Sequence, residues 1–372
     1  MIDPSLLVPD TKLYLRPIWF AESPVGLDGQ TARMGGGLLW FQGYEITARH
    51  QAVIQRDRVS VAAFPEWCAH LPEPLAMRAA SLAANISTIR PPLALRERIV
   101  RFDVPQVMGI MNMTPDSFSD GGKHLGDPQA AADAGFAMVA AGAAIVDVGG
   151  ESTRPGADKV AEVDEIARVV PVIERLAASG VPVSVDTRKA GVMEAALNAG
   201  AAIVNDISGL MHDPRALEVV AEAGCPVVLM HSPSSGDDPH KGGDYGDAVT
   251  DIFDWLEARI AACEAAGVPR ANIVADPGIG FGKPLAVSLA IMNRLALYQA
   301  LGVPVLLGAS RKRIIGALSN EASADRRLGG SLALAMRGLG SGAQMLRVHD
   351  VEETVQAVHV WRGLRDAALT EG

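Results

Sequence analysis

The sequence predicts an α/β protein, a (β/α)8 TIM barrel preceded by a small N-terminal α/β accessory domain. The chain of 372 residues has room for a barrel of roughly 250 residues and one small further domain. From residue 104 onward, short apolar runs alternate with Ala- and Leu-rich helical stretches, a pattern typical of parallel strands joined by helical crossovers. Eight such pairs favour a closed barrel, with an open doubly wound sheet as the alternative.

Residues 1–95 are expected to form the accessory region and residues 96–372 the barrel. The first region holds three of the five tryptophans. Strands are predicted at Lys12–Phe20 and Gly37–Thr47, a helix at Leu75–Ile89 and a linker at Arg90–Arg98. No catalytic signature lies in this region, which favours a structural role for it.

The barrel strands are predicted where apolar residues gather in runs of three to six. The runs are Gln106–Met111, Ala144–Val148, Val181–Val185, Ala202–Val204, Pro226–Met230, Asn272–Ala275, Val303–Leu307 and Gln344–Val348. The helical stretches are Pro128–Ala141, Val160–Ala178, Lys189–Asn198, Pro214–Ala223, Ala248–Ala266, Leu285–Ala300, Ser323–Leu339 and Val351–Leu364.

Composition limits the function classes. Hydrophobic residues make up 49% and charged residues 20%, as in packed globular proteins. The net charge of −10 argues against general nucleic-acid binding, which needs clustered cations. Three cysteines without metal-knuckle spacing, and an N-terminus without a secretory pattern, predict a cytoplasmic protein. The longest nearly apolar stretch, Phe136–Val146, is about half of the ~20 residues that a membrane span needs, so we expect no membrane association.

Polar segments follow the predicted strands, whereas the segments after the predicted helices hold few residues that could bind or react with a substrate. The polar segments read NMTPDSFSDGG, GGESTRPG, DTR, NDISG, HSPSSGDDPHKGGDYG, DPGIGFGK, GASRKR and RVHDV. Barrel enzymes place their sites at the carboxyl ends of the strands, so this asymmetry predicts an enzyme. The two long early loops, Asn112–Lys123 and Gly149–Ala157, are expected to close over a substrate.

Three polar residues directly end apolar runs, namely Asp186, Asn205 and Asp276. Two carboxylates and an amide at the barrel mouth can read the edge of a flat heterocycle, and a guanidine-like edge suits a carboxylate. The alternative is that each caps a helix, since Asp and Asn are favoured N-caps. All three at strand ends favour the binding interpretation.

Cations near the last two strands predict an anion site. Arg347 and His349 alternate along the final strand, so both are expected to reach the mouth and suit a phosphate or pyrophosphate. Within the basic run after the seventh strand, Arg313 is expected to be solvated, whereas a neighbour such as Lys312 can turn inward. The glycine-rich segment Asp276–Lys283 is neither a phosphate loop nor a dinucleotide fingerprint, and its glycines permit close approach to a ligand.

Seven segments, in this order, resemble the dihydropteroate synthases of folate biosynthesis. They are Met108–Gly122 (MGIMNMTPDSFSDGG), Gly149–Gly156 (GGESTRPG), Val183–Thr187, Asn205–Ile207, Asp276–Lys283, Ser310–Lys312 and Arg347–Asp350. The match covers roughly residues 100–365. The resemblance implies a TIM barrel transferase that joins p-aminobenzoate to 6-hydroxymethyl-7,8-dihydropterin diphosphate, giving 7,8-dihydropteroate and pyrophosphate by an SN1-like displacement. It also implies a homodimer with small-molecule substrates and no nucleic-acid or membrane partner.

The resemblance carries residue roles onto this chain. The catalytic set is Asp186, Asp276, Lys312, Arg347 and His349. The pterin site is Asp186, Asn205, Met230, Asp276, Phe281, Gly308, Lys312 and Arg347. Pyrophosphate binding falls to Asn112, Arg154, Arg347 and His349, with Mg²⁺ bound near Asn112. The p-aminobenzoate site is Phe118, Thr153, Pro155 and Ser310.

The chain departs from the family pattern in places, and two alternatives are weighed. After Met230 and His231 it continues Ser-Pro-Ser-Ser where the family often has Met-Gln-Gly, and the N-terminal 95 residues are additional. One alternative is a methyltransferase that moves a methyl group from methyltetrahydrofolate to a corrinoid; it should lack the pyrophosphate clamp. The other is a catalytically inactive pterin-binding paralogue, which should show damage in the early loops or at Lys312, and none is visible.

Overall fold

The computed structural model describes residues 2–3, 6–114, 127–154, 156–236 and 238–370. At its centre is a sheet of eight parallel strands in the order β12-β11-β10-β9-β8-β7-β14-β13. The strands are β7 (Gln106–Asn112), β8 (Ile145–Gly149), β9 (Val183–Asp186), β10 (Ile203–Asp206), β11 (Val227–Met230), β12 (Ile273–Asp276), β13 (Leu306–Leu307) and β14 (Met345–Val348). A parallel bridge between Ala275 and Val305 joins the two ends of this sheet. The closed barrel is therefore confirmed, and the open sheet is excluded.

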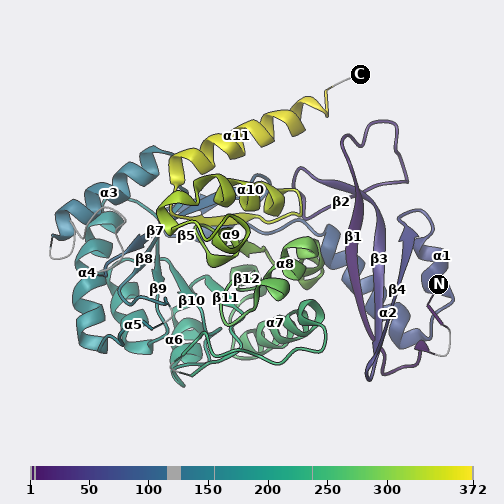
Figure 1. Cartoon of the computed structure of the whole chain (residues 1–372), viewed down its shortest axis with the longest axis horizontal. Helices are drawn as coiled ribbons and strands as arrows, with labels where there is room; N and C mark the ends of the chain where they lie inside the picture. The colour runs from purple at the N-terminus through teal and green to yellow at the C-terminus, as the bar shows by residue number, and fades with distance from the viewer. Residues whose placement is uncertain (1, 4–5, 115–126, 155, 237, 371–372) are drawn as a thin grey trace.

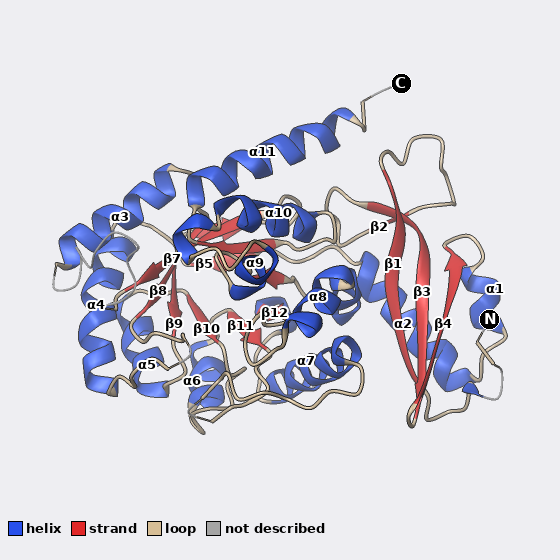
Figure 2. Ribbon diagram, viewed as in Figure 1, coloured by secondary structure: helices blue, strands red, loops and turns tan. Residues whose placement is uncertain are grey.

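Helices surround the barrel (Figures 1 and 2). They are α3 (Pro128–Ala140), α4 (Glu162–Ala178), α5 (Ala190–Ala199), α6 (Ala216–Ala223), α7 (Ala248–Ala265), α8 (Leu285–Asn293), α9 (Arg313–Leu318), α10 (Leu328–Leu339) and α11 (Val351–Ala367), with the 3-10 helices η2 (Arg270–Asn272), η3 (Leu295–Leu301) and η4 (Ala324–Arg326). The single helix predicted over Leu285–Ala300 was wrong, because the chain tightens into η3, all seven residues of which are buried. Helix α9 was not predicted.

Local sequence signals account for several helix ends. Asp127 caps α3 by accepting hydrogen bonds from the N–H groups of Gln129 and Ala130, and proline occupies the first turn. Asp247 caps α7 in the same way through the N–H of Thr250. Helix α6 ends at Gly224, whose φ of 60° lies in the left-handed region that favours glycine.

A short hairpin closes the bottom of the barrel. It consists of β5 (Leu93–Leu95) and β6 (Arg98–Val100), paired antiparallel. Leu93, Leu95 and Val100 are buried against side chains at the amino ends of the barrel strands, including Met108 and Ile145. The linker predicted over Arg90–Arg98 was therefore wrong, since alternate leucines there supply an apolar plug. The predicted division between residues 95 and 96 falls in the turn of this hairpin and stays a prediction.

The N-terminal residues form an antiparallel sheet with two helices, at the end of the molecule beside α7 and α8 (Figure 1). The elements are β1 (Lys12–Ala21), β2 (Ala32–Arg33), β3 (Trp40–His50), β4 (Val53–Ser60), α1 (Phe64–Ala69) and α2 (Glu73–Ser87). The structure confirms the two predicted strands and the helix. Strand β4 was missed because its sequence, VIQRDRVS, is mostly polar.

Among the described residues, no helix has both the length and the apolar character that a membrane span requires. All three cysteines are free thiols.

Candidate active site

Four neighbouring strands bring predicted site residues to one level of the barrel mouth. In the parallel register, Asn112 of β7 pairs with Gly149 of β8, Gly149 with Asp186 of β9, and Asp186 with Asn205 of β10. A Cβ on Gly149 would lie 3.5 Å from Asn112 Oδ1 and 3.4 Å from the Asp186 Cβ. Asn112 and Asp186, which were predicted from separate segments, therefore lie on either side of Gly149, which has no side chain.

Arg347 of β14 crosses the barrel and binds two carboxylates. Its Nε donates to Asp147 Oδ2 at 2.6 Å, and its Nη2 donates to Asp186 Oδ2 at 2.6 Å. Asp147 Oδ2 also accepts a hydrogen bond from Asn205 Nδ2 at 2.9 Å. Asp147 is fully buried in β8 and was missed by the sequence reasoning. Its one sequence signal is a carboxylate within the apolar run Ile145–Gly149.

Asp276 ends β12 and is held by the glycine-rich loop that follows. Its Oδ1 accepts a hydrogen bond from the Gly278 N–H at 2.7 Å. Gly278 has a φ of +69°, and a Cβ there would lie 2.1 Å from the carbonyl oxygen of His231, so only glycine fits. The buried ammonium of Lys283 donates to the same His231 carbonyl at 2.9 Å and to that of Gly278 at 2.8 Å. Sequence reasoning gave Lys283 no role of its own.

Lys312 turns inward, as predicted for one member of the basic run. Its Nζ lies 4.4 Å from the centre of the Phe281 ring and donates to the carbonyl of Ile279. Gly308 lies between Asp276 and Arg347, since a Cβ there would be 3.6 Å from Asp276 Oδ2 and 3.9 Å from the Arg347 Cβ. Arg313, by contrast, has a side chain that is 78% exposed, which confirms that it is solvated.

His349 and Ser310 form a second polar pair at the mouth. Ser310 Oγ lies 3.1 Å from His349 Nδ1 and accepts a hydrogen bond from the His349 N–H at 3.2 Å. Burial and then the charge of Arg347 lower the pKa of His349 to about 3. The imidazole is therefore neutral at pH 7, and one of its nitrogens is an acceptor.

The second early loop, Gly149–Ala157, meets a histidine that was not predicted. His240, in the β11–α7 loop, stacks on Phe281 with ring centres 5.1 Å apart, and its Nε2 lies 2.6 Å from the carbonyl oxygen of Thr153. Arg154 is exposed beside Thr153. Met230 is buried at the end of β11 and pairs with Asp276. Two predicted p-aminobenzoate residues, Phe118 and Pro155, lie outside the described residues.

Burial shifts the pKa values of several site residues toward their neutral forms, whereas Asp147 and Asp186 raise the pKa of Arg347 despite its burial. It raises the pKa values of Asp186 and Asp276, against the opposing charges of Arg347 and Lys312 respectively. Burial likewise lowers the pKa of Lys312 to about 8 and that of Lys283 to about 7, although Asp276 opposes both shifts. Such shifted pKa values gathered at one end of a barrel are typical of ligand-binding and catalytic sites.

The donor set suits a metal ion that arrives with its ligand. Among the described residues, no group of three or more His, Cys, Asp or Glu side chains is arranged to hold a metal. Asn112 offers one amide oxygen beside Asp186. Mg²⁺ commonly keeps several waters and binds few protein ligands together with substrate phosphates, so Asn112 fits this mode and not a permanent protein-only cage.

Comparisons with known proteins agree with this geometry. The pterin binding enzyme family matches residues 108–349. The dihydropteroate synthase of Bacillus subtilis is 45% identical over 267 residues, covering 72% of this chain and 89% of that protein. A probable bifunctional folylpolyglutamate synthase/dihydropteroate synthase of Haloferax volcanii is 47% identical over 268 residues, which is 71% of this chain but only 31% of that longer protein.

Solved structures give the same result. The Xanthomonas albilineans dihydropteroate synthase with 4-aminobenzoic acid has a TM-score of 0.69 and 45% identity, covering 74% of this chain and 98% of that one. The same enzyme in complex with 7,8-dihydropteroate has a TM-score of 0.67 and 43% identity, covering 74% and 99%.

The chain belongs to the pterin binding enzyme family, whose model matches residues 108–349. Within that family it falls among the dihydropteroate synthases, the transferases of folate biosynthesis.

Proposed function

We propose that this chain joins 6-hydroxymethyl-7,8-dihydropterin diphosphate to p-aminobenzoate, giving 7,8-dihydropteroate and pyrophosphate. The observation that carries the proposal is the set of opposite charges around one end of the barrel, with Asp186, Asn205 and Asp276 at strand ends and Lys312 facing Asp276. The relatives' names and the solved complex with 7,8-dihydropteroate support the same reaction.

The pterin half binds among the strand-end residues. Asp186 and Asp276 accept hydrogen bonds from the amino-pyrimidine edge, and Asn205 supplies an amide to the same ring. Arg347 is fixed by its bonds to Asp147 and Asp186, so its flat guanidinium offers a face for ring stacking. Lys312 donates to an electron-rich ring atom, while Met230, Phe281 and Gly308 line the pocket.

The diphosphate half binds at Asn112, Arg154, Arg347 and His349. When bound, Mg²⁺ near Asn112 would neutralise charge on the diphosphate. The C–O bond at the pterin methylene breaks and pyrophosphate leaves with the electron pair, which places positive charge on the methylene. The amine nitrogen of p-aminobenzoate then forms the C–N bond and loses a proton. An arylamine is already nucleophilic, so the chain needs no strong general base. Thr153, Ser310, Phe118 and Pro155 are proposed to shape the p-aminobenzoate side.

The test mixes the purified protein with dihydropterin diphosphate, p-aminobenzoate and Mg²⁺, and measures pyrophosphate and dihydropteroate in the same reaction. Equal amounts of both products, each dependent on p-aminobenzoate and Mg²⁺, support the proposal. Pterin binding without either product would instead favour the inactive paralogue. Methyl transfer from methyltetrahydrofolate to a corrinoid would favour the methyltransferase.

We also propose that the protein works as a cytoplasmic homodimer. The family resemblance supports the dimer, and the three free thiols fit a reducing compartment. Light scattering coupled to size exclusion, at micromolar concentration, gives the mass directly. A monomer under assay conditions would overturn the dimer.

A further inference from the structure

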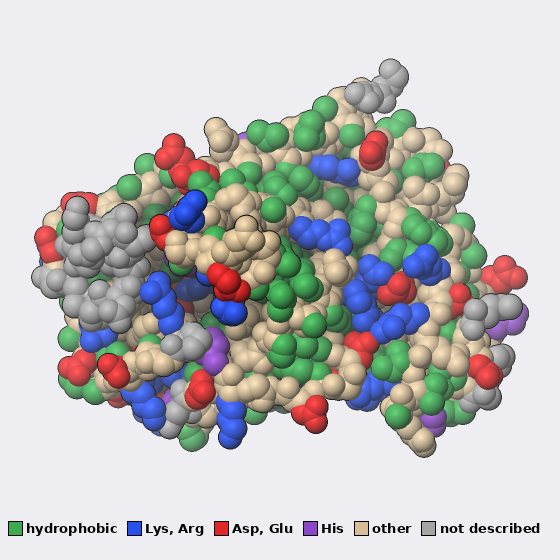
Figure 3. Space-filling view, in the orientation of Figure 1, with side chains coloured by type: hydrophobic (Ala, Val, Ile, Leu, Met, Phe, Trp, Pro, Cys, Tyr) green, Lys and Arg blue, Asp and Glu red, His purple; other side chains and the backbone are tan. Residues whose placement is uncertain are grey.

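The N-terminal sheet docks on the barrel through complementary charges. One face of α7 carries acidic residues spaced three or four apart, a spacing that puts them side by side. They are Asp247, at the N-cap, and Asp251, Asp254 and Glu257. The N-terminal region supplies cations opposite this face, from β1, β3, β4 and α2. Figure 3 shows Lys and Arg side chains gathered over this junction.

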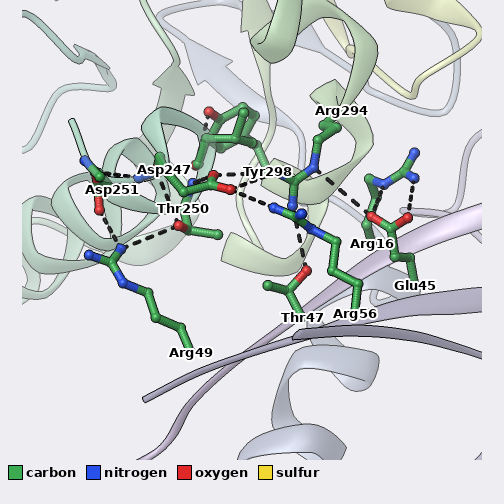
Figure 4. A network of polar contacts seen from close by, with 12 residues as sticks. Arg16, Glu45, Thr47, Arg49, Arg56, Asp247, Thr250, Asp251, Arg294 and Tyr298 are labelled. Carbon is green, nitrogen blue, oxygen red and sulfur yellow. Dashed lines mark hydrogen bonds and ion pairs between the residues drawn. The ribbon is translucent and has the colours of Figure 1, made fainter. Parts of the chain in front are cut away.

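Each acid of the α7 face has a cation from the N-terminal region as its partner. Arg56 donates to Asp247 Oδ2 at 2.5 Å, and Arg49 donates to Asp251. Further along the helix, Lys12 binds Asp254 at 2.6 Å, and Arg78 binds Glu257 with two N–H groups at 2.7 and 3.0 Å. The junction therefore has a loop end, held by Arg49 and Arg56, and a far end, held by Lys12 and Arg78 (Figure 4 shows the loop end).

The loop end also fixes where the β11–α7 loop stops. Asp251 Oδ2 accepts hydrogen bonds from the N–H groups of Gly246 at 2.8 Å and Asp247 at 3.2 Å. Gly246 packs on Arg49, since a Cβ there would lie 3.5 Å from the Arg49 Nη2. The carboxylates that bind Arg49 and Arg56 thus also cap α7 and hold the last residue of the loop.

Six residues before Gly246, the same loop reaches the active site. His240 stacks on Phe281 and bonds to the carbonyl of Thr153. The loop backbone also packs on Gly282, where a Cβ would lie 3.1 and 3.2 Å from the carbonyl oxygens of Lys241 and His240. A short run of chain, 240–246, therefore joins the junction to the barrel mouth.

We propose that Arg49 and Arg56 are positioning residues for the active site. By holding Asp251 and Asp247 they fix the end of the β11–α7 loop, and this places His240 against Phe281 and Thr153. Because Thr153 belongs to the p-aminobenzoate side, the residues act on that substrate more than on the pterin. The kinetic part of this inference rests on the proposed function, whereas its structural part does not.

The experiment compares Arg49→Ala/Arg56→Ala with a control at the far end of the junction, Lys12→Ala/Arg78→Ala. Both remove two cations from the same interface, but only the first touches the loop end. Hydrogen exchange of peptides covering 232–246 is measured without substrate, followed by kcat and KM for each substrate.

We expect faster exchange across 232–246 in the first variant and not in the control. We also expect the KM for p-aminobenzoate to rise about tenfold, with kcat and the KM for the pterin within about twofold. Arg49→Lys/Arg56→Lys should recover most of the change. Adding His240→Ala to the first variant should raise the KM little further, because both changes remove the same contact.

Equal exchange of the loop in both variants, or equal changes of KM, would overturn the inference, since the junction would then act only as a whole. If the double variant fails to fold, Arg56→Gln against Arg78→Gln makes the same comparison. If the wild-type protein makes no dihydropteroate, the proposed function fails, and the exchange measurement still decides the positioning role.

Discussion

The molecule holds two clusters of charged residues that differ in how burial and pairing balance. At the junction between the N-terminal sheet and α7, burial raises the pKa values of Glu45 and Asp247, but the bonds and charges of Arg16 and Arg294 outweigh it and hold both values below their ordinary range. At the barrel mouth, burial outweighs pairing for the carboxylates, whereas Asp147 and Asp186 raise the pKa of Arg347 despite its burial. Asp186 and Asp276 have raised pKa values.

This difference separates a stabilising interface from a binding site. Glu45 and Asp247, with an excess of arginines around them, are better off charged in the folded state although their side chains are only 10% and 14% exposed, and each ion pair contributes modestly to stability. Buried groups whose charged forms are disfavoured can gain stabilising hydrogen bonds and charge contacts when a polar ligand binds. Substitutions at the barrel mouth should therefore lower activity more than stability, and substitutions at the junction should lower stability more than activity.

The largest effect is expected at Lys312. Lys312→Ala removes the ammonium between Phe281 and Asp276, and condensation should fall by about a thousandfold, or ~4 kcal/mol. Melting temperature should stay the same or rise, because a desolvated charge is lost. Arg313→Ala, one residue away and exposed, is the matched control and should keep the wild-type rate. A folded Lys312→Ala protein with near-normal turnover would contradict the account.

Asp147→Asn is expected to give the next largest change. Asp147 accepts bonds from Arg347 and Asn205, and the variant leaves the guanidinium with less compensation inside the barrel. We expect a loss of about 2–3 kcal/mol in the free energy of unfolding and about tenfold weaker pterin binding. Urea unfolding and a fluorescence titration with the pterin measure the two. Unchanged pterin affinity would show that Asp147 does not position the ring-binding residues.

A smaller, pH-dependent effect should come from Lys312 in the intact protein. Its pKa, lowered by burial to about 8, means that the ammonium loses its proton as the pH rises through that value. The kcat/KM for the pterin substrate should therefore fall above about pH 8, by up to tenfold per pH unit. Lys312→Arg, if active, should abolish this limb because arginine stays charged. A flat profile to pH 9 in the wild-type protein would exclude this role for the ammonium.

The smallest effect is expected at the junction in acid. Glu45 and Asp247 have pKa values below the ordinary 4.5 and 3.8, so they bind fewer protons folded than unfolded. Their contribution is complete above those ordinary values and is lost as the pH falls below about 4, at roughly 1 kcal/mol together. Thermal melts between pH 3 and 6 should show a steeper acid slope for the wild type than for Arg16→Ala/Arg294→Ala. Parallel slopes would count against this view.

The barrel and most of the polar residues at the strand ends could be predicted from the sequence, because both follow from local patterns. Apolar runs and turn signals place the strands, and polar residues at their carboxyl ends must meet at one face. Residues whose role depends on a contact with a distant part of the chain have no such local pattern in the sequence. Nothing in the sequence distinguishes His240 from other loop histidines, because its contact with Phe281 forms only in the folded chain. Asp147 is a single carboxylate within an apolar strand. Strand β4 was missed because its sequence is mostly polar; its two arginines are exposed, and Arg56 binds Asp247 at the N-cap of α7.

The most direct test of the two-cluster account compares Asp276→Ala with Asp254→Ala, measuring the rate of dihydropteroate formation at equal concentrations of folded protein. Asp276 lies at the barrel mouth, whereas Asp254 binds Lys12 and Tyr14 at the junction. Asp276→Ala is expected to lose activity by about a thousandfold, whereas Asp254→Ala is expected to keep a rate within about twofold of wild type. Wild-type-like turnover by folded Asp276→Ala would contradict it.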